Sequence, residues 1–236
     1  MTYLEVHNLH KRFLTPGGQE VKALNGVSFE IDRGEILCVV GHNGSGKTTL
    51  LNCLRRTFSW DEGAIRINGK VTGDNSVNIV SVFQDVGLGV VGSMTPTENL
   101  SLAFSKHPGF INSFPNRRFE EQINILLKDA GLQSRFKSFG NTSVSELSGG
   151  QRQQVAIMMA VLRQPDLLLL DEFVANLDPK VKMDILSWMR IWIQQNKITT
   201  VMVTHDMNMA ENLGDWILEL LDGKVIRFKK TKNYKN

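Results

Sequence analysis

Eight consecutive residues decide the fold: Gly41-His42-Asn43-Gly44-Ser45-Gly46-Lys47-Thr48. Their glycines let the backbone wrap closely around a phosphate group, the lysine can reach the phosphate oxygens, and the threonine supplies a hydroxyl for magnesium. The apolar run Ile36–Val40 comes directly before them and predicts a buried strand. A helix predicted over residues 47–56 comes directly after them, and the N-terminus of a helix favours an anion. A strand, this loop and a helix in that order predict a phosphate-binding loop, or P-loop.

Three apolar runs of the chain lack the polar alternation of a half-exposed strand. They are residues 36–40, 167–170 and 198–203. Continuous apolar strands belong in parallel sheets that helices cover on both faces. The sequence therefore predicts an α/β core with a mostly parallel sheet.

The segments around this core have a different character. The N-terminal third predicts short strands joined by turns, among them residues 4–9 and 27–31. Residues 83–149 predict helices instead, because Thr95-Pro96-Thr97-Glu98 has the pattern of a capping box and residues 119–130 form a further helical segment. We therefore expect a helical subdomain inserted into the α/β core.

Composition narrows the class of protein. The chain has 236 residues, of which 42% are hydrophobic, so it can bury one sizeable core. The formal net charge is +3 and the basic residues are scattered along the chain, so no nucleic-acid partner is expected. We interpret the one basic cluster, residues 224–235, as a solvated C-terminal tail, with contact to anionic lipid or a partner as the alternative. The turn Asp222-Gly223 also predicts a short final strand after it.

The sequence also bears on the compartment. Its longest apolar runs are far shorter than the roughly 20 residues that a membrane-spanning helix needs, and its start carries no secretory signal pattern. Two cysteines, Cys38 and Cys53, indicate neither a disulfide framework nor a metal site. We therefore expect a cytoplasmic protein that does not itself cross a membrane.

A second motif, Leu147-Ser148-Gly149-Gly150-Gln151, combines a helix-capping serine with two glycines and leads into an apolar-patterned helix. Glycine leaves backbone N–H groups accessible, so this pattern predicts a second helix start that can bind an anion. An ordinary capped helix is the alternative.

With these two motifs the chain resembles the ATP-binding cassette (ABC) family of transporter ATPases over nearly its whole length. The motif at residues 147–151 matches the family's signature motif, and residues 167–172 match its Walker B strand. The resemblance implies a P-loop NTPase core with a mostly parallel sheet, an N-terminal antiparallel β subdomain and an inserted α-helical subdomain. It places the core and the β subdomain approximately in residues 1–84 and 162–236, and the helical subdomain in residues 85–161. It also implies ATP and Mg²⁺ as ligands and hydrolysis of ATP to ADP and phosphate.

The resemblance assigns a role to each matching residue. Glu172 would polarise the attacking water and His205 would contact the γ-phosphate, with Lys47 and Gln84 as further catalytic residues. Magnesium would be held by Thr48, Gln84 and Asp171. The nucleotide would be bound by Phe13, Gly41, His42, Asn43, Gly44, Ser45, Gly46, Lys47, Thr48, Thr49, Ser148, Gly149, Gly150, Gln151 and Asp178. The stretch Phe173-Val174-Ala175-Asn176 departs from the family's usual small, hydroxyl-bearing residues.

The resemblance also implies partners. In this family the signature motif faces the nucleotide of another subunit, so it implies a head-to-tail dimer of two copies that buries two ATP molecules. It further implies integral-membrane permease subunits, a substrate-binding protein and a peripheral location on the inner face of the cell membrane. Import of an amino acid-like substrate is the expected activity. The alternatives are a lipid or lipoprotein exporter ATPase and a soluble cassette ATPase that acts on nucleic acid or ribosomes.

Overall fold

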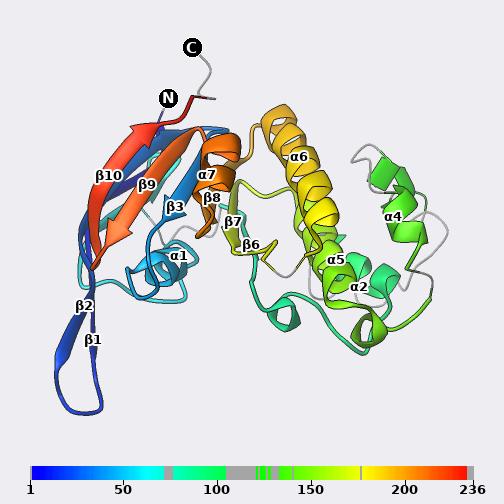
Figure 1. The fold of residues 1–236 in the computed structure, drawn as a ribbon, viewed down its shortest axis with the longest axis horizontal. Coiled ribbons are helices and arrows are strands. Elements are labelled where there is room, and N and C mark those ends of the chain that lie inside the picture. The colour runs from blue at the N-terminus through cyan, green and yellow to red at the C-terminus, as the bar shows by residue number, and fades with distance from the viewer. Residues whose placement is uncertain are drawn as a thin grey trace. The chain divides into compact units, whose positions relative to one another are not determined.

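The computed structural model describes residues 2–71, 77–104, 121, 123–125, 127–128, 133–139, 141–175 and 177–232. Half of the helix predicted over residues 119–130 lies outside this range, as does Asn176, and the described residues of that helix are helical. The chain divides into two compact units, whose elements are labelled in Figure 1. The first unit comprises Met1–Val80, Asp166–Glu172 and Ile193–Asn236, and the second comprises Ser81–Pro165 and Phe173–Trp192.

A six-stranded sheet carries the centre of the first unit. Its strands run in the order β10 (Lys224–Lys230), β9 (Trp216–Leu221), β3 (Ile36–Val40), β8 (Thr199–Val203), β7 (Leu167–Asp171) and β6 (Ile79–Val82). β3 pairs in parallel with β8 and β9, and β8 pairs in parallel with β7. Every residue of β3 and β8 is buried, as the continuous apolar runs predict. The predicted α/β core is therefore confirmed.

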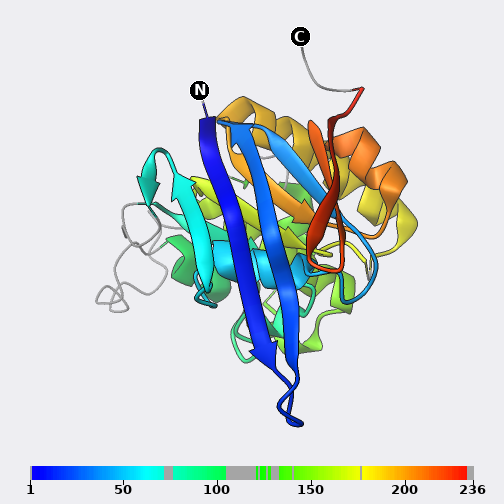
Figure 2. The ribbon, with the colours of Figure 1, turned by 90° about the vertical axis from the view of Figure 1, so that its left-hand side faces the viewer.

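A second, antiparallel sheet forms the N-terminal part of the first unit. Its order is β2 (Glu20–Asp32), β1 (Thr2–Leu14), β4 (Glu62–Ile67) and β5 (Lys70–Val71). Figure 2 shows β1 and β2 as one long hairpin beside β4. Both strands extend beyond the ranges expected from sequence. A register shift between Val6 and Leu9 changes which face of the sheet the side chains occupy on either side of it. Asn8, at φ 46°, lies at this bulge, and the regular alternation of the sequence stops there.

Both sheets and helix α1 (Lys47–Leu54) share one apolar core. Leu50 and Leu51 of α1 are fully buried in it, together with Leu169 of β7. α1 is the helix that follows the P-loop, so burial of its apolar side chains fixes where that loop begins and ends. Another helix of the first unit, α7 (Met207–Leu213), is capped by Asp206, whose carboxylate accepts a hydrogen bond from the Met209 N–H at 3.0 Å.

The basic cluster near the C-terminus does not form a solvated tail over its first half. Lys224–Lys230 is strand β10, antiparallel to β9. Phe228 of β10 stacks on Trp216 of β9 with ring centroids 4.6 Å apart. The tail interpretation is therefore wrong for these residues, because aromatic packing and strand pairing order the backbone while the lysine side chains stay on the surface.

The second unit is helical in the part that the structure describes. It contains the short 3₁₀ helices η1 (Val86–Leu88) and η3 (Val144–Glu146), and the α-helices α2 (Pro96–Phe104), α4 (Gln133–Lys137) and α5 (Gly149–Leu162). A long helix, α6 (Pro179–Asn196), begins in this unit. The capping box of α2 is confirmed, since the Glu98 carboxylate accepts hydrogen bonds from the Thr95 N–H at 2.7 Å and the Thr95 hydroxyl at 2.9 Å. Within the described ranges, none of the helices combines the length and the hydropathy of a membrane span.

Candidate nucleotide-binding site

The P-loop joins β3 to α1 and depends on glycine for its path. Gly41 and Gly46 have φ values of 148° and 104°. A Cβ added at Gly41 would collide with the Leu220 carbonyl oxygen, and one added at Gly46 would collide with the Ala23 carbonyl oxygen. Gly44 has φ 81° but no atom within 4 Å of such a Cβ. Two glycines are thus required by close backbone packing, and the third leaves the outer side of the loop open.

Lys47 is held inside its own loop. Its side chain is buried, and Nζ donates hydrogen bonds to the carbonyl oxygens of Gly41 and His42, each at 2.7 Å. Burial lowers the pKa of Lys47, while the nearby carboxylates of Glu172 and Asp171 act in the opposite direction. The loop therefore fixes a positive charge between the P-loop backbone and two acidic side chains.

The start of α1 fits a phosphate group. The helix-capping residue is Gly46, and no side chain caps the helix N-terminus. Ser45 is 2% exposed, and its hydroxyl has no hydrogen-bond partner among the described residues. A buried hydroxyl without a partner costs free energy, and uncapped N–H groups carry the positive end of the helix dipole. An anion at this place would accept hydrogen bonds from the Ser45 hydroxyl and from the uncapped N–H groups of α1. Thr48 lies exposed at the first turn of the helix.

Two carboxylates lie at the end of β7. Burial raises the pKa of Asp171, and Arg55 is the main influence that lowers it. Glu172 follows in a left-handed backbone conformation, at φ 41°, and its N–H donates to the Val203 carbonyl at 3.1 Å. The left-handed backbone at Glu172 ends the strand directly after Asp171.

His205 lies beside Glu172. Its Nδ1 atom is 3.4 Å from the Glu172 Oε1 atom, and its side chain is 69% exposed compared with 17% for Glu172. Their closeness follows from the sheet, because β8 lies between β3 and β7 and parallel strands end at one edge. The first unit therefore brings Lys47, Asp171, Glu172 and His205 to the edge of the sheet where the P-loop begins.

Phe13 is the aromatic residue expected to contact the base. Its side chain is 38% exposed and meets Phe58 edge-on, with centroids 5.6 Å apart and ring planes at 72°. Lys11 Nζ lies 5.3 Å from the centre of the Phe13 ring. Phe58 and Arg55 are not among the residues predicted from sequence. Both lie just beyond α1, so their place after the P-loop helix was the available signal.

The other predicted site residues belong to the second unit. Ser148 caps α5, since its hydroxyl accepts from the Gln151 N–H at 3.3 Å and the Gln151 side-chain oxygen accepts from the Ser148 N–H at 2.9 Å. Nothing lies within 4 Å of a Cβ added at Gly149. Gln84 is exposed, and so is Asp178, whose carboxylate accepts from the Lys180 N–H at 3.0 Å at the start of α6. The predicted serine cap is confirmed, and the surface around Gly149 is open.

The residues present also suit a magnesium ion. Among the described side chains, no group of three His, Cys, Asp or Glu residues could hold a metal alone. Magnesium bound with a nucleotide needs only one or two carboxylates, because phosphate oxygens and waters fill its other positions. One hydroxyl, Thr48, and one carboxylate, Asp171, therefore match what such an ion takes from a protein.

Replacing Gly46 by alanine is expected to destabilise the first unit more than replacing Gly44. Both changes place a side chain in the left-handed region, at a cost of about 1–2 kcal/mol. Only Gly46→Ala also pushes Cβ into the Ala23 backbone, which adds about 1–3 kcal/mol. Urea unfolding without nucleotide measures the difference, and equal midpoints for Gly46→Ala and Gly44→Ala would contradict this steric account.

Comparison with known proteins agrees with this geometry. Residues 24–175 match the family model described as "ABC transporter". The chain is 35% identical over 238 residues to a tyrosine transport ATP-binding protein of Clostridioides difficile, covering 99% of this chain and 94% of that protein. It is 33% identical to a phosphonates import ATP-binding protein of Alcaligenes faecalis, covering 94% of this chain and 81% of that protein.

A solved structure of a dimeric ATP-binding cassette, in a post-hydrolysis state bound to ADP and phosphate, superposes with a TM-score of 0.82. That match has 30% sequence identity and covers 99% of both chains. The P-loop NTPase fold and the ATPase activity follow from these matches together. This chain is an ATPase that belongs to the ABC transporter family.

Proposed function

We propose that this ATPase energises the import of a small substrate through partner permease subunits. The proposed ATP hydrolysis site is supported by one observation: the side chains of Lys47, Asp171, Glu172 and His205 lie at the same edge of the six-stranded sheet. The import part is supported by the names of the relatives, which act in tyrosine transport and phosphonates import.

In the proposed site the P-loop binds the phosphates of ATP. Backbone N–H groups of residues 41–49 surround them, and Lys47 exchanges its contacts with Gly41 and His42 for phosphate oxygens. Thr48, Asp171 and Gln84 would hold Mg²⁺. When bound, that ion neutralises charge on the phosphates and helps to orient them. Phe13 stacks on the base, and because it lacks a polar atom it gives little discrimination between purines.

Glu172 is the proposed general base. Its carboxylate accepts a proton from the attacking water, which then forms the new bond to the γ-phosphorus as the bond to the β–γ bridging oxygen breaks. His205, 3.4 Å from that carboxylate, orients it and contacts the γ-phosphate from the end of β8. The strained backbone at Glu172 supports the assignment, because such conformations cluster at functional sites.

A second copy of the chain completes the proposed site. Each unit carries a structure suited to phosphate, namely the P-loop in the first and the open start of α5 in the second. In a head-to-tail dimer, Ser148, Gly149 and Gly150 of one copy would cover the γ-phosphate held by the other, with Gln151 and Asp178 nearby. The structural relative in a post-hydrolysis state is itself dimeric. Hydrolysis would then open the dimer and drive the permease.

The proposed partners complete the transporter. Residues 1–84 and 162–236 would form the catalytic core with its β subdomain, and residues 85–161 a helical subdomain that meets the permease. The chain would be peripheral on the cytoplasmic face of the membrane, and a substrate-binding protein would deliver the substrate. An amino acid-like substrate is favoured, because the relative with 35% identity is a tyrosine transport protein.

Transport in reconstituted vesicles tests this proposal. The chain is purified with the multi-span membrane protein that co-purifies with it and is placed in proteoliposomes, and ATP-dependent uptake of labelled tyrosine is measured against labelled phosphonate and methionine. Uptake that requires ATP on the side of this chain is expected.

Three outcomes would redirect the assignment. ATP-dependent movement of lipid or lipoprotein out of the membrane would make the chain an exporter ATPase. DNA or ribosome binding with a steep salt dependence, and no membrane partner, would favour the soluble alternative. Uptake of a different labelled substrate would keep import and change only the substrate class.

A further inference from the structure

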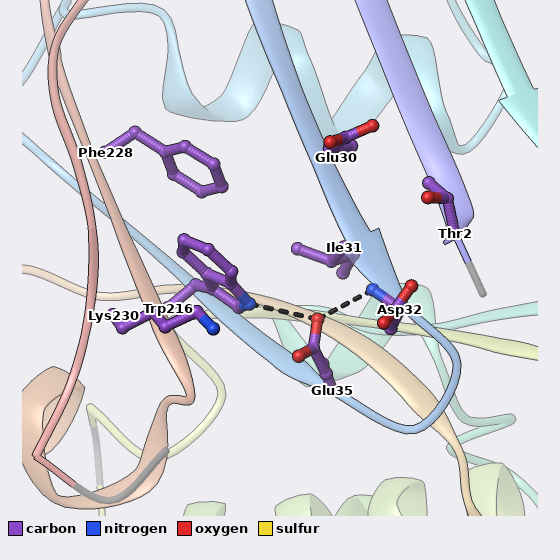
Figure 3. A pocket seen from close by; sticks show the side chains of 8 residues that line it. All are labelled: Thr2, Glu30, Ile31, Asp32, Glu35, Trp216, Phe228 and Lys230. Carbon is purple, nitrogen blue, oxygen red and sulfur yellow. Dashed lines mark hydrogen bonds between the residues drawn. The ribbon is translucent and has the colours of Figure 1, made fainter. Parts of the chain in front are cut away.

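A cavity of about 290 Å³ lies in the first unit, away from the P-loop. Figure 3 shows the side chains around it, which come from β1, the end of β2, the turn before β3, and strands β9 and β10. Its lining residues are Thr2, Glu30, Ile31, Asp32, Glu35, Trp216, Phe228 and Lys230. Glu35 directly precedes β3, whereas the P-loop directly follows it. The five residues of β3 separate the two sites by roughly 16 Å.

One wall of the cavity is aromatic. Trp216 and Phe228 stack nearly parallel, with centroids 4.6 Å apart and planes at 13°. Lys230 Nζ lies 5.2 Å from the centre of the Trp216 ring, and Figure 3 shows it on the opposite side of Trp216 from Phe228. Phe228 is only partly buried, so an aromatic surface with a negative π-face remains at the cavity.

A fixed carboxylate forms another part of the lining. One oxygen of Glu35, Oε2, accepts hydrogen bonds from the Trp216 indole N–H at 2.9 Å and from the Asp32 N–H at 2.6 Å. Both donors use the same oxygen, so Oε1 receives no hydrogen bond from the described residues. The donors hold the carboxylate in place without neutralising its charge.

The charges around the cavity are unequal. Glu30, Asp32 and Glu35 bring three carboxylates, and Lys230 brings one ammonium group. Glu30 is exposed, and its carboxylate makes no ion pair or hydrogen bond within the described part of the chain. A cation at such a site is attracted both by the quadrupole of the aromatic ring and by the negative charge of the carboxylates.

We propose that this cavity binds an organic cation, an ammonium or guanidinium group on an apolar body. The charged group lies at Glu35, beside the aromatic wall, and the apolar part rests on Phe228, while Glu30 adds negative charge at the other end of the lining. The volume is at the lower end of the range for ligand pockets, so the group that enters is small. This site is independent of the transport proposal, because none of its residues belongs to the nucleotide site.

Titration of the whole protein with four matched probes tests the proposal. Phenethylammonium is the cation, phenylacetate the anion, 2-phenylethanol the neutral analogue and phenylalanine the zwitterion, and isothermal calorimetry follows each. Phenethylammonium is expected to bind, and the other three to bind more weakly. Equal binding of the neutral analogue, tighter binding of the anion or zwitterion, or no binding of the cation would overturn the proposal.

Two charge-removing variants locate the site. Glu30→Gln is expected to weaken phenethylammonium binding about three- to fivefold, since an exposed ion pair is worth little. Glu35→Gln keeps an oxygen that accepts from Trp216 and Asp32, and with Glu30→Gln it is expected to weaken binding more than about tenfold. Glu20→Gln, the same change at the other end of β2, is the control and should bind like wild type. Wild-type affinity in the double variant, with an unchanged urea midpoint, would overturn the proposal.

A blocked arginine amide, added in the same way, separates two sources of the cation. Tighter binding of this amide than of phenethylammonium would support a basic side chain on a partner protein. The reverse order would support a free amine. Both results keep the cation site and differ only in what carries the charge.

Discussion

Glu172→Gln is expected to bind ATP like the wild-type protein and to lose about 10²- to 10⁴-fold of its turnover, the range supplied by a positioned general base. An amide has nearly the shape of a carboxylate but cannot accept the proton of the attacking water. It can still sit at φ 41° and still contact His205. Phosphate release measures turnover, and a fluorescent ATP analogue measures binding.

The same variant should accumulate as an ATP-dependent dimer, visible by size-exclusion chromatography, because ATP stays intact between two copies. Glu219→Gln is the matched control. Glu219 lies on β9 in the same unit, pairs with Arg227 at 3.5 Å, and takes no part in the proposed site. Wild-type turnover in the Glu172→Gln protein would contradict the assignment of Glu172 as the general base. Slow turnover without a trapped dimer would contradict the proposal that two copies form the site.

Lys47→Ala is expected to weaken ATP binding by about 10- to 100-fold, the value of a charge-assisted hydrogen bond to phosphate. In the structure Lys47 Nζ already lies at the P-loop, bonded to the carbonyl oxygens of Gly41 and His42. Removing it takes away the positive charge that offsets Asp171 and Glu172. The phosphates would then meet two carboxylates without a compensating cation.

Equilibrium binding of the fluorescent ATP analogue measures this loss. Lys224→Ala, an exposed lysine at the start of β10, is the control and should bind normally. Lys47→Arg keeps the charge but replaces a compact ammonium by a planar fork that does not fit the same carbonyl pair, so it should recover only part of the affinity. Unchanged binding by Lys47→Ala would show that the loop does not hold the phosphates.

In both units, the features that could be predicted from sequence are those with local signals. Continuous burial of Ile36–Val40 follows from its unbroken apolar character, and that of Thr199–Val203 from the absence of charged residues and of regular polar alternation. The caps of α2 and α5 depend on residues three positions apart, Thr95 with Glu98 and Ser148 with Gln151, so they too could be read directly. The prediction of a parallel sheet also implied that the carboxyl ends of these strands meet at one edge of the sheet.

Other features depend on contacts between distant residues and left no local signal. Asn8 takes a left-handed conformation because the hairpin bulges there. The stacking of Phe228 on Trp216, which lies twelve residues earlier in the chain, is one such contact. Phe58 meets Phe13 across 45 positions of sequence. Each needs the tertiary structure, since nothing in the residue types alone names the partner.

The helical spacing of two tryptophans on α6 indicates a shared face but not how deeply that face is buried. Trp188 and Trp192 stack on each other with centroids 6.1 Å apart, as their spacing of four residues allows. Both nevertheless stay partly exposed, whereas Met158 and Met159 of α5 are buried. Helical spacing indicates which side chains share a face, and only the packing of the helix determines whether that face is covered.

The backbone at Glu172 has a consequence for how this protein tolerates change. A non-glycine residue at φ 41° costs about 1–2 kcal/mol relative to glycine. Glycine at this position would relieve that strain and would remove the carboxylate. If Glu172 is the proposed general base, selection for stability and selection for turnover oppose each other at position 172.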